Sequence, residues 1–405
     1  MQGVAGVDDH MTQTLAEATY TAWDRIIDLC LTKNVDFLIL SGDIYDSGDK
    51  NVQAQLRFVK GLKKIADHGI KSYIVHGNHD PLPFWSSSVK LPPEACRFTS
   101  SEPERVVHTR NGTAVATIVG ASIPERWTAE DIVSTFPEKE RDWPFTIGVV
   151  HCNVDGVIGH DPYAPCTRQD LVNAGYDYWA LGHIHLPTVV QDANPAIIYC
   201  GNPQGRHIGE SGPRGCYLVT VDEQKLLQTE FLPTQAVRFE QITININGVA
   251  TLDGFTDLAS DTLGVRSEEL ECPMICRITL EGRTAISSSL SDAGDLRDLR
   301  EQIGEDCRMF RYPVIIERME NRTYPVIDRE TVKERPDLAG DICRITDALL
   351  TESGTGGPIQ EALAPLFTNH RYRHSFENCS DEELQEIIRE AEGLLLSRLV
   401  GGEDS

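Results

Sequence analysis

Four apolar segments, each of strand length, end at side chains of the types that bind metals. The segments are 35–41, 70–76, 145–150 and 176–181. They run, in turn, into Gly42-Asp43, Gly77-Asn78-His79-Asp80, His151 and Gly182-His183-Ile184-His185. Open α/β sheets carry their sites at the carboxyl ends of strands, so the pattern predicts a site there. We expect the glycines to allow the sharp turns that aim the next side chain into it.

The segments between and after these strands complete the picture of a layered domain. Residues 14–33 form an apolar stripe at helical spacing, and Thr14 with Glu17 fits a capping box. A second helix is expected at 51–68, and further strands at 113–120, 196–200 and 215–221. Unbroken apolar strands separated by helices predict α/β layers in which both sheet faces are covered.

The chain is too long for a single domain. Its 405 residues exceed the ~250–300 at which one core stops growing. Strands are expected at 237–246, 274–280 and 311–316, and helices at 251–259, 287–303, 340–350, 358–367 and 381–399, with a linker at 352–357. We therefore predict a first domain at 1–233, a small α+β domain at 234–335 and a helical segment at 336–405.

Composition narrows the class of protein. The net charge of −25 counts against a stand-alone DNA binder, although it leaves room for a local basic groove or a basic partner chain. Solubility alone accounts for such acidity. The eleven cysteines are odd in number and scattered without a Cys-x-x-Cys, which favours reduced thiols in the cytoplasm. No apolar run reaches the ~18 residues of a membrane helix, and the N-terminus does not read as a signal peptide.

The candidate ligands combine carboxylate and amide oxygens with imidazole nitrogens. This mixture suits Mn²⁺, Fe or Zn²⁺ better than a thiolate site or Mg²⁺ alone. Two metals ~3.5–4 Å apart can hold a phosphate and stabilise both the attacking and the leaving oxygen. Each piece alone is weak evidence, because a Gly-Asp is often only a turn and a buried histidine is often a core residue.

Taken together and in this order, the motifs resemble the calcineurin-like metallophosphoesterase superfamily. The stretches 159–166, 176–183 and 201–207 further resemble its SbcD-type exonuclease branch, and within it the YhaO-like proteins. The similarity covers about 1–235 well. It implies a four-layer α/β/β/α sandwich, followed by a capping domain.

The resemblance also implies roles for the candidate residues. Asp43 would bridge two divalent metals, expected to be Mn²⁺. Asn78, His151 and His183 would complete one metal, and His185 would belong to the other. His79 would protonate the leaving oxygen with Asp80 orienting its ring, which agrees with the chemistry of an imidazole beside a carboxylate. Further candidates, for an outer position or for substrate contact, are Asp46, Arg206 and His207.

The first motif of the family, Asp-x-His at the end of a first strand, is absent. Asp8-Asp9-His10 has suitable residue types, but no apolar strand precedes it and it lies close to Asp43. We therefore expect the first domain to be truncated at its N-terminus, the second metal site to be incomplete, and the chain to be a poor catalyst. A start codon assigned too late is the simplest cause.

The resemblance implies hydrolysis of phosphodiester bonds in DNA, as the exonuclease subunit of an SbcCD-like repair complex. It further implies a homodimer and an ATPase partner of the SbcC type with coiled coils, and no membrane. The leucine stripe of 381–399 is a candidate docking element, although it would equally serve packing on its own domain. Two alternatives stay open: a small-molecule or cyclic-nucleotide phosphodiesterase, and a catalytically impaired interaction subunit. The extension beyond the sandwich argues against the first.

Overall fold

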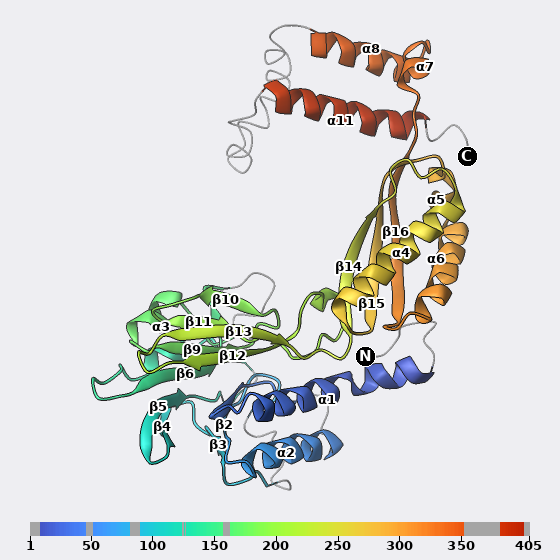
Figure 1. Ribbon diagram of the computed structural model, residues 1–405. Helices are drawn as coiled ribbons and strands as arrows, with labels where there is room; N and C mark the ends of the chain where they lie inside the picture. The colour runs from blue at the N-terminus through green and yellow to red at the C-terminus, as the bar shows by residue number, and fades with distance from the viewer. Residues whose placement is uncertain are drawn as a thin grey trace. The chain divides into compact units, whose positions relative to one another are not determined.

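The computed structural model describes residues 9–45, 52–81, 90–123, 125, 127–156, 163–351 and 381–400. The chain divides into two compact units (Figure 1). The first comprises 1–240, 267–276 and 311–317, and the second comprises 241–266, 277–310 and 318–405. None of the helices in these described ranges combines the length and the apolar character needed to cross a membrane.

The first unit begins with two helices on a small parallel sheet. The helices are α1 (Asp9–Thr32) and α2 (Val52–Ala66), and the strands, in sheet order, are β1 (Phe37–Ser41), β2 (Lys71–Val75) and β3 (Ala95–Arg97). The apolar stripes of both helices pack on one face of this sheet, where Ile27, Leu62 and Ile74 are buried. Burial of these stripes is the main source of helix stability here.

The start of α1 differs from the prediction. The helix begins at Asp9, so Thr14 lies inside it and the predicted capping box is wrong. Residues 9–13 contain neither proline nor glycine, so nothing in this segment ends a helix.

A six-stranded sheet forms the second β-layer. Its order is β10-β11-β9-β6-β5-β4, with the inner four strands parallel and both edges antiparallel. The strands are β4 (Glu104–Arg110), β5 (Thr113–Gly120), β6 (Phe145–His151), β9 (Tyr178–Gly182), β10 (Thr188–Gln191) and β11 (Ala196–Tyr199). One core joins the two sheets face to face, with Tyr73 and Phe98 packed among side chains of β5, β6 and β9.

The far face of the six-stranded sheet is covered by a thin layer. It contains α3 (Arg168–Asn173), the 3-10 turn η2 (Val133–Thr135) and the loop that carries Trp143, all packed on a core around Trp179. The four-layer α/β/β/α arrangement is therefore confirmed, with a last layer that is mostly loop.

Short pairs of strands extend the first unit. They are β7 (Asn153–Val154) with β8 (Pro165–Cys166), and β12 (Gly215–Val221) with β13 (Leu227–Pro233). Between β11 and β12 lies the 3-10 turn η3 (Ile208–Glu210). The loop that contains η3 returns the chain to the strand ends.

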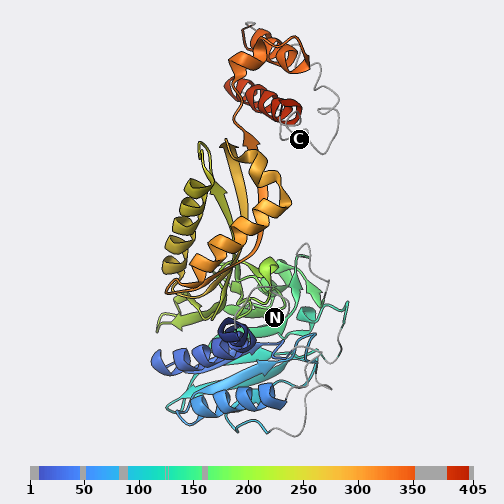
Figure 2. The same cartoon turned by 90° about the vertical axis from the view of Figure 1, so that its right-hand side faces the viewer.

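A three-stranded sheet follows in the order β14-β15-β16. Its strands are β14 (Arg238–Asn245), β15 (Met274–Thr284) and β16 (Val314–Pro325), and α4 (Leu252–Leu270) and α6 (Ala293–Arg308) run along them (Figures 1 and 2). The single helix predicted at 287–303 is two helices, α5 (Ser287–Ser291) and α6. The break occurs because the Asp292 side chain accepts from Gly294 N and Asp295 N and so caps α6.

The last described segment is helical, with α7 (Arg329–Lys333), α8 (Leu338–Thr351) and α11 (Asp381–Val400). Cys343 of α8 and Leu396 of α11 share a small core, and Arg329 joins Glu392 to Asp347. The predicted helix 358–367 and linker 352–357 lie outside the described residues.

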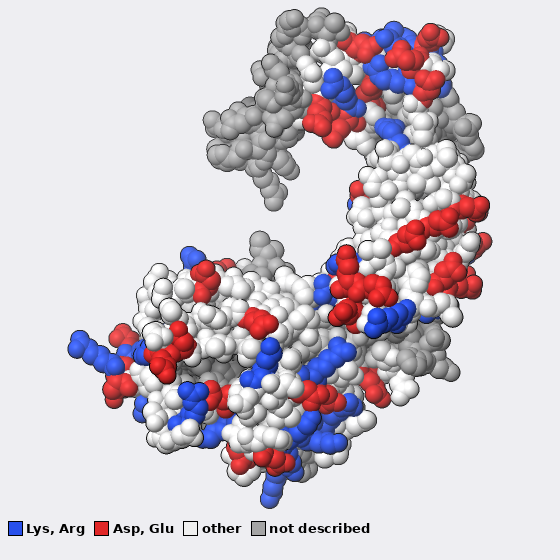
Figure 3. Space-filling model, viewed as in Figure 1, with Lys and Arg blue, Asp and Glu red and all other residues white. Residues whose placement is uncertain are grey.

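Charge is unevenly distributed over the surface. In Figure 3 acidic side chains follow the region of α4, whose sequence includes Asp253, Asp257 and Asp261. Lys and Arg side chains are frequent over α1 and α2, among them the exposed Lys60 and Lys63. The first unit is still acidic as a whole, so these basic side chains are a local feature of its surface.

Candidate metal centre

Asp80 joins the loops that follow β1 and β2. Its Oδ1 accepts from Asp43 N at 3.1 Å and from Gly77 N at 2.9 Å, and its Oδ2 accepts from Ile44 N at 2.9 Å. Burial raises the pKa of Asp80 to about 6, although the bond from Gly77 N–H opposes the shift. Since the side chain is only 2% exposed, the carboxylate is an internal anchor for both loops.

Two glycines are required by close approach. A Cβ on Gly77 would stand 2.2 Å from Asp43 Oδ1, and a Cβ on Gly182 would stand 1.9 Å from Ser41 O. Among Gly42, Gly77 and Gly182, only Gly42, which precedes Asp43, has a positive φ, of 93°. The turn prediction thus holds for Gly42, while the other two let neighbouring strand ends approach each other.

His151 lies at the centre of the cluster. The ring is 1% exposed, and its Nδ1 donates to the carbonyl of Ser41 at 2.8 Å. Its Nε2 lies 2.9 Å from Asn78 Oδ1 and 3.3 Å from Asp43 Oδ2. Burial acts to lower the pKa of His151, but the Asp43 carboxylate, together with the Ser41 carbonyl and Asp80, raises the pKa overall. Burial likewise acts to raise the pKa of Asp43, and His151 and His79 hold it below its ordinary value.

The donor atoms of these three residues fit a metal ion. A carbonyl oxygen only accepts, so His151 Nδ1 carries a proton, and in the neutral ring Nε2 presents a lone pair. The amide oxygen of Asn78 and the carboxylate oxygen of Asp43 each lie ~3 Å from that nitrogen, which is the separation of adjacent ligands that each lie ~2.1 Å from one ion. In the described part of the chain, no three His, Cys, Asp or Glu side chains lie close enough together to hold a metal ion. The cluster at His151 differs from such a group in that one of its three donors is the amide of Asn78.

His183 lies beside this cluster. Its ring centroid is 5.3 Å from that of His151, and its ring stacks on Tyr163 at 5.5 Å. His183 has φ of 95° and Asp43 has φ of 54°, both in the left-handed region. Such backbone strain in non-glycine residues gathers at functional sites. His79 joins the cluster through its backbone, because His79 N donates to Asp43 Oδ1 at 2.9 Å.

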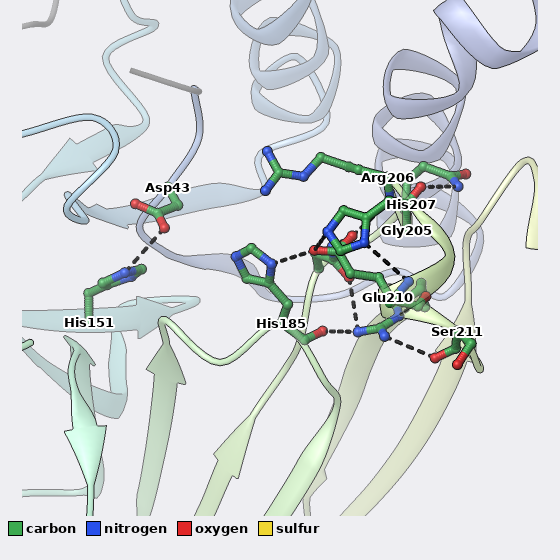
Figure 4. A network of polar contacts seen from close by, with 12 residues as sticks. Asp43, His151, His185, Gly205, Arg206, His207, Glu210 and Ser211 are labelled. Carbon is green, nitrogen blue, oxygen red and sulfur yellow. Dashed lines mark hydrogen bonds and ion pairs between the residues drawn. The ribbon is translucent and has the colours of Figure 1, made fainter. Parts of the chain in front are cut away.

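His185 is held by a different partner, which the sequence did not reveal. Its Nδ1 lies 2.6 Å from Glu210 Oε1, in the loop that returns through η3 (Figure 4). Burial acts to raise the pKa of Glu210, but the bonds from His185 and from Arg206 N lower it to about 2. Glu210 is separated from His185 by 25 positions, so no local motif indicates the pair.

Arg206 and His207 stand in the same loop, and both are exposed. In Figure 4 the Arg206 side chain extends from its loop in the direction of Asp43. His207 Nε2 is 3.9 Å from Glu210 Oε1, beyond hydrogen-bond distance.

The remaining candidates are not placed. Asp46 and Asp8 lie outside the described residues, and Asp9 and His10 open α1 without described side chains. The structure thus gathers Asp43, Asn78, His151 and His183 on one side of the site and His185, Glu210 and Arg206 on the other.

Two family models match the chain. The model for the calcineurin-like phosphoesterases, which bind divalent metals, matches residues 9–187. A second model, the middle domain of metallophosphoesterase YhaO, matches residues 239–324. The first match spans the strand ends from Asp43 to His185.

Individual relatives point the same way. The metallophosphoesterase YhaO of Bacillus subtilis is 29% identical over 401 residues, which cover 98% of this chain and 94% of that protein. The DNA double-strand break repair protein Mre11 of Sulfurisphaera tokodaii is 24% identical over 197 residues, 45% of this chain and 47% of the relative. The SbcD component of the nuclease SbcCD of Bacillus subtilis is 23% identical over 223 residues, 47% of this chain and 56% of the relative.

The last two relatives are matched over only about half of their length, at low identity. The match to YhaO covers nearly the whole chain. Within it, the calcineurin-like phosphoesterase model is followed by the model of the YhaO middle domain. The chain therefore contains a calcineurin-like metallophosphoesterase domain, followed by a middle domain of the YhaO kind.

Proposed function

We propose that this protein is a Mn²⁺-dependent phosphodiesterase that hydrolyses DNA as an exonuclease. The observation that carries the proposal is the convergence of Asp43 Oδ2 and Asn78 Oδ1 on His151 Nε2 at the carboxyl ends of β1, β2 and β6. Mixed oxygen and imidazole ligands suit Mn²⁺.

In this proposal Asp43, Asn78, His151 and His183 hold one metal, while Asp43 and His185 face a second position. Divalent metals supply positive charge to phosphoryl oxygens and lower the pKa of water. The chain itself holds the ligands in place: the Asp80 carboxylate fixes both loops, and the Ser41 carbonyl fixes the ring of His151.

His79 is the proposed general acid. The bond from its backbone N–H to Asp43 keeps the residue at the edge of the ligand cluster. An imidazole can carry the proton that the leaving oxygen requires near neutral pH. Asp80 was expected to orient this ring. Its carboxylate also accepts hydrogen bonds from three backbone N–H groups, so Asp80 fixes the loop on which His79 lies.

DNA is the proposed substrate because two of the relatives are named for DNA double-strand break repair and for the SbcCD nuclease. Exposed Arg206 and His207 are the proposed phosphate contacts. In functional terms we keep the parts 1–233, 234–335 and 336–405 as nuclease domain, capping domain and helical segment. The ten described cysteines are all free thiols, which supports a cytoplasmic location.

We further propose a coiled-coil ATPase of the SbcC kind as partner, and a homodimer. α11 packs on α8 through Leu396, yet Ile387, Leu394 and Leu395 stay exposed on it. Val52 and Leu56 are exposed on α2 and offer an apolar patch to a second copy. The double substitution Leu394→Asp/Leu395→Asp should abolish co-purification with the ATPase and leave small-ester hydrolysis unchanged.

The experiment that tests the function compares substrates. Purified protein with Mn²⁺ is given end-labelled DNA, bis-p-nitrophenyl phosphate and cyclic nucleotides. Release of mononucleotides from DNA ends supports the proposal. Cleavage of cyclic nucleotides alone would assign a small-molecule phosphodiesterase instead, and no hydrolysis with any divalent metal would assign an interaction subunit.

A further inference from the structure

A chain of hydrogen bonds runs from a buried arginine to His185. We infer that Arg214, Asn202 and Glu210 together fix the tautomer of His185, with the proton on Nδ1 and the lone pair of Nε2 directed away from Glu210. The inference rests on the proposed function in one respect, because it gives that lone pair the task of binding a metal.

The chain begins at Arg214, which is 3% exposed. A guanidinium has five N–H donors and no acceptor. Its Nε donates to Glu210 O at 3.2 Å, its Nη2 donates to Ser211 O at 2.9 Å, and its Nη1 donates to the carbonyl of His185. Nη1 also donates to Asn202 Oδ1 at 3.3 Å. The amide of Asn202 therefore has one orientation, with its oxygen toward Arg214 and its nitrogen away.

The orientation of Asn202 determines which hydrogen bonds Glu210 accepts. Asn202 Nδ2 donates to Glu210 Oε2 at 3.0 Å, and Arg206 N donates to the same oxygen at 2.7 Å. Oε2 is thus an acceptor twice over. Oε1 is directed to His185 Nδ1 at 2.6 Å, and a carboxylate can only accept there. Nδ1 must carry the proton.

Histidines that bind metals commonly donate their other N–H to a carboxylate, which fixes both the tautomer and the orientation of the ring. Glu210 stands in that position for His185. It is a positioning residue, since it acts through the imidazole and through the loop of Arg206.

The substitution Glu210→Gln isolates this role, because it replaces one oxygen by NH₂ with little change of shape. The side-chain oxygen is required at the Oε2 position, where Asn202 and Arg206 present two donors. The NH₂ group must then face His185 Nδ1, which can only accept from it. The proton of the neutral ring moves to Nε2, and the lone pair that faced the metal position is lost.

The tautomer can be read directly without metal, substrate or activity. Protein with ¹⁵N-labelled histidine is held at about pH 8, above the ordinary imidazole pKa of ~6.5, and the ¹⁵N shifts separate protonated from unprotonated ring nitrogens. The signals of His185 are identified by their loss in His185→Asn. We expect protonated Nδ1 in the wild type and protonated Nε2 in Glu210→Gln.

The matched control is Asp177→Asn. Asp177 is also a partly buried carboxylate that accepts from a backbone N–H, Thr146 N at 2.6 Å, and pairs with a side chain, Lys139. It precedes β9, away from the carboxyl end of that strand. This control should leave the His185 signals and hydrolysis unchanged, whereas Glu210→Gln should weaken Mn²⁺ binding or turnover by ~10–100-fold.

A wild-type His185 with its proton on Nε2 would overturn the inference, even if Glu210→Gln failed to fold. An unchanged tautomer in folded Glu210→Gln would overturn it as well. Failure of the proposed function gives a different result: no phosphodiester hydrolysis with any metal, while both tautomers are as predicted.

Discussion

His151 and His185 are held at the same site by two different means. His151 is buried, and its Nδ1 donates to a backbone carbonyl, that of Ser41. His185 is partly exposed, and its Nδ1 meets the side chain of Glu210. The first ring is therefore fixed by a backbone group at the end of a strand, and the second by a side chain of the loop that contains η3. Changes around His151 should affect both fold and chemistry, while changes around His185 should affect chemistry alone.

The largest expected effect on the His151 side, short of losing the metal, comes from His79→Ala. Removal of a general acid should lower turnover by ~10²–10⁴-fold. Metal content, measured by mass spectrometry of the purified protein, should stay the same because the imidazole of His79 is not a ligand in this account. Loss of metal together with activity would make His79 a ligand.

Asp80→Asn tests whether the His151 side depends on the fold. The Asn oxygen can replace Oδ1, which serves two donors, but its NH₂ then faces Ile44 N, another donor. The unpaired group should lower the free energy of unfolding by ~1–3 kcal/mol, as measured by urea denaturation. An unchanged midpoint would show that the two loops do not need this anchor.

On the His185 side the contrast is tested by Arg206→Ala. A charged hydrogen bond to phosphate is worth ~1.5–3 kcal/mol, so KM should rise about tenfold or more while urea stability stays constant. Arg206→Lys keeps the charge and should recover part of the loss. A lower urea stability with an unchanged KM in Arg206→Ala would contradict the expectation that changes around His185 affect chemistry and leave the fold unchanged.

The sequence was sufficient for the parts that local patterns encode. Each strand that carries a ligand is a short apolar run. Asp43, Asn78 and His183 lie within three residues after the ends of their strands, and His151 is the last residue of β6. Parallel pairing brings Asp43 near Asn78 at the end of one sheet and His151 near His183 at the end of the other, and the packing of the two sheets face to face then brings the two pairs together. The same runs predicted α/β layers with covered sheet faces, whereas the four-layer arrangement was an expectation from the family resemblance.

The remainder depends on contacts between distant residues. Glu210 meets His185 only because η3 brings the loop back, and Arg214 is buried because three backbone carbonyls surround it. Neither residue lies in a periodic pattern. The predicted capping box at Thr14 failed for the opposite reason: a local signal was present, but the helix continued through it.

The most direct test of the metal centre is a Mn²⁺ titration of the wild type and of Asp43→Asn. Bound Mn²⁺ is followed by electron paramagnetic resonance, and hydrolysis of bis-p-nitrophenyl phosphate is measured on the same samples. We predict that the wild type binds Mn²⁺ with coupling to histidine nitrogen, and that Asp43→Asn stays folded and loses hydrolysis by at least ~10³-fold, since a metal supplies several kcal/mol to the transition state. Equal Mn²⁺ affinity and equal hydrolysis in Asp43→Asn would contradict the assignment of the centre to these strand ends.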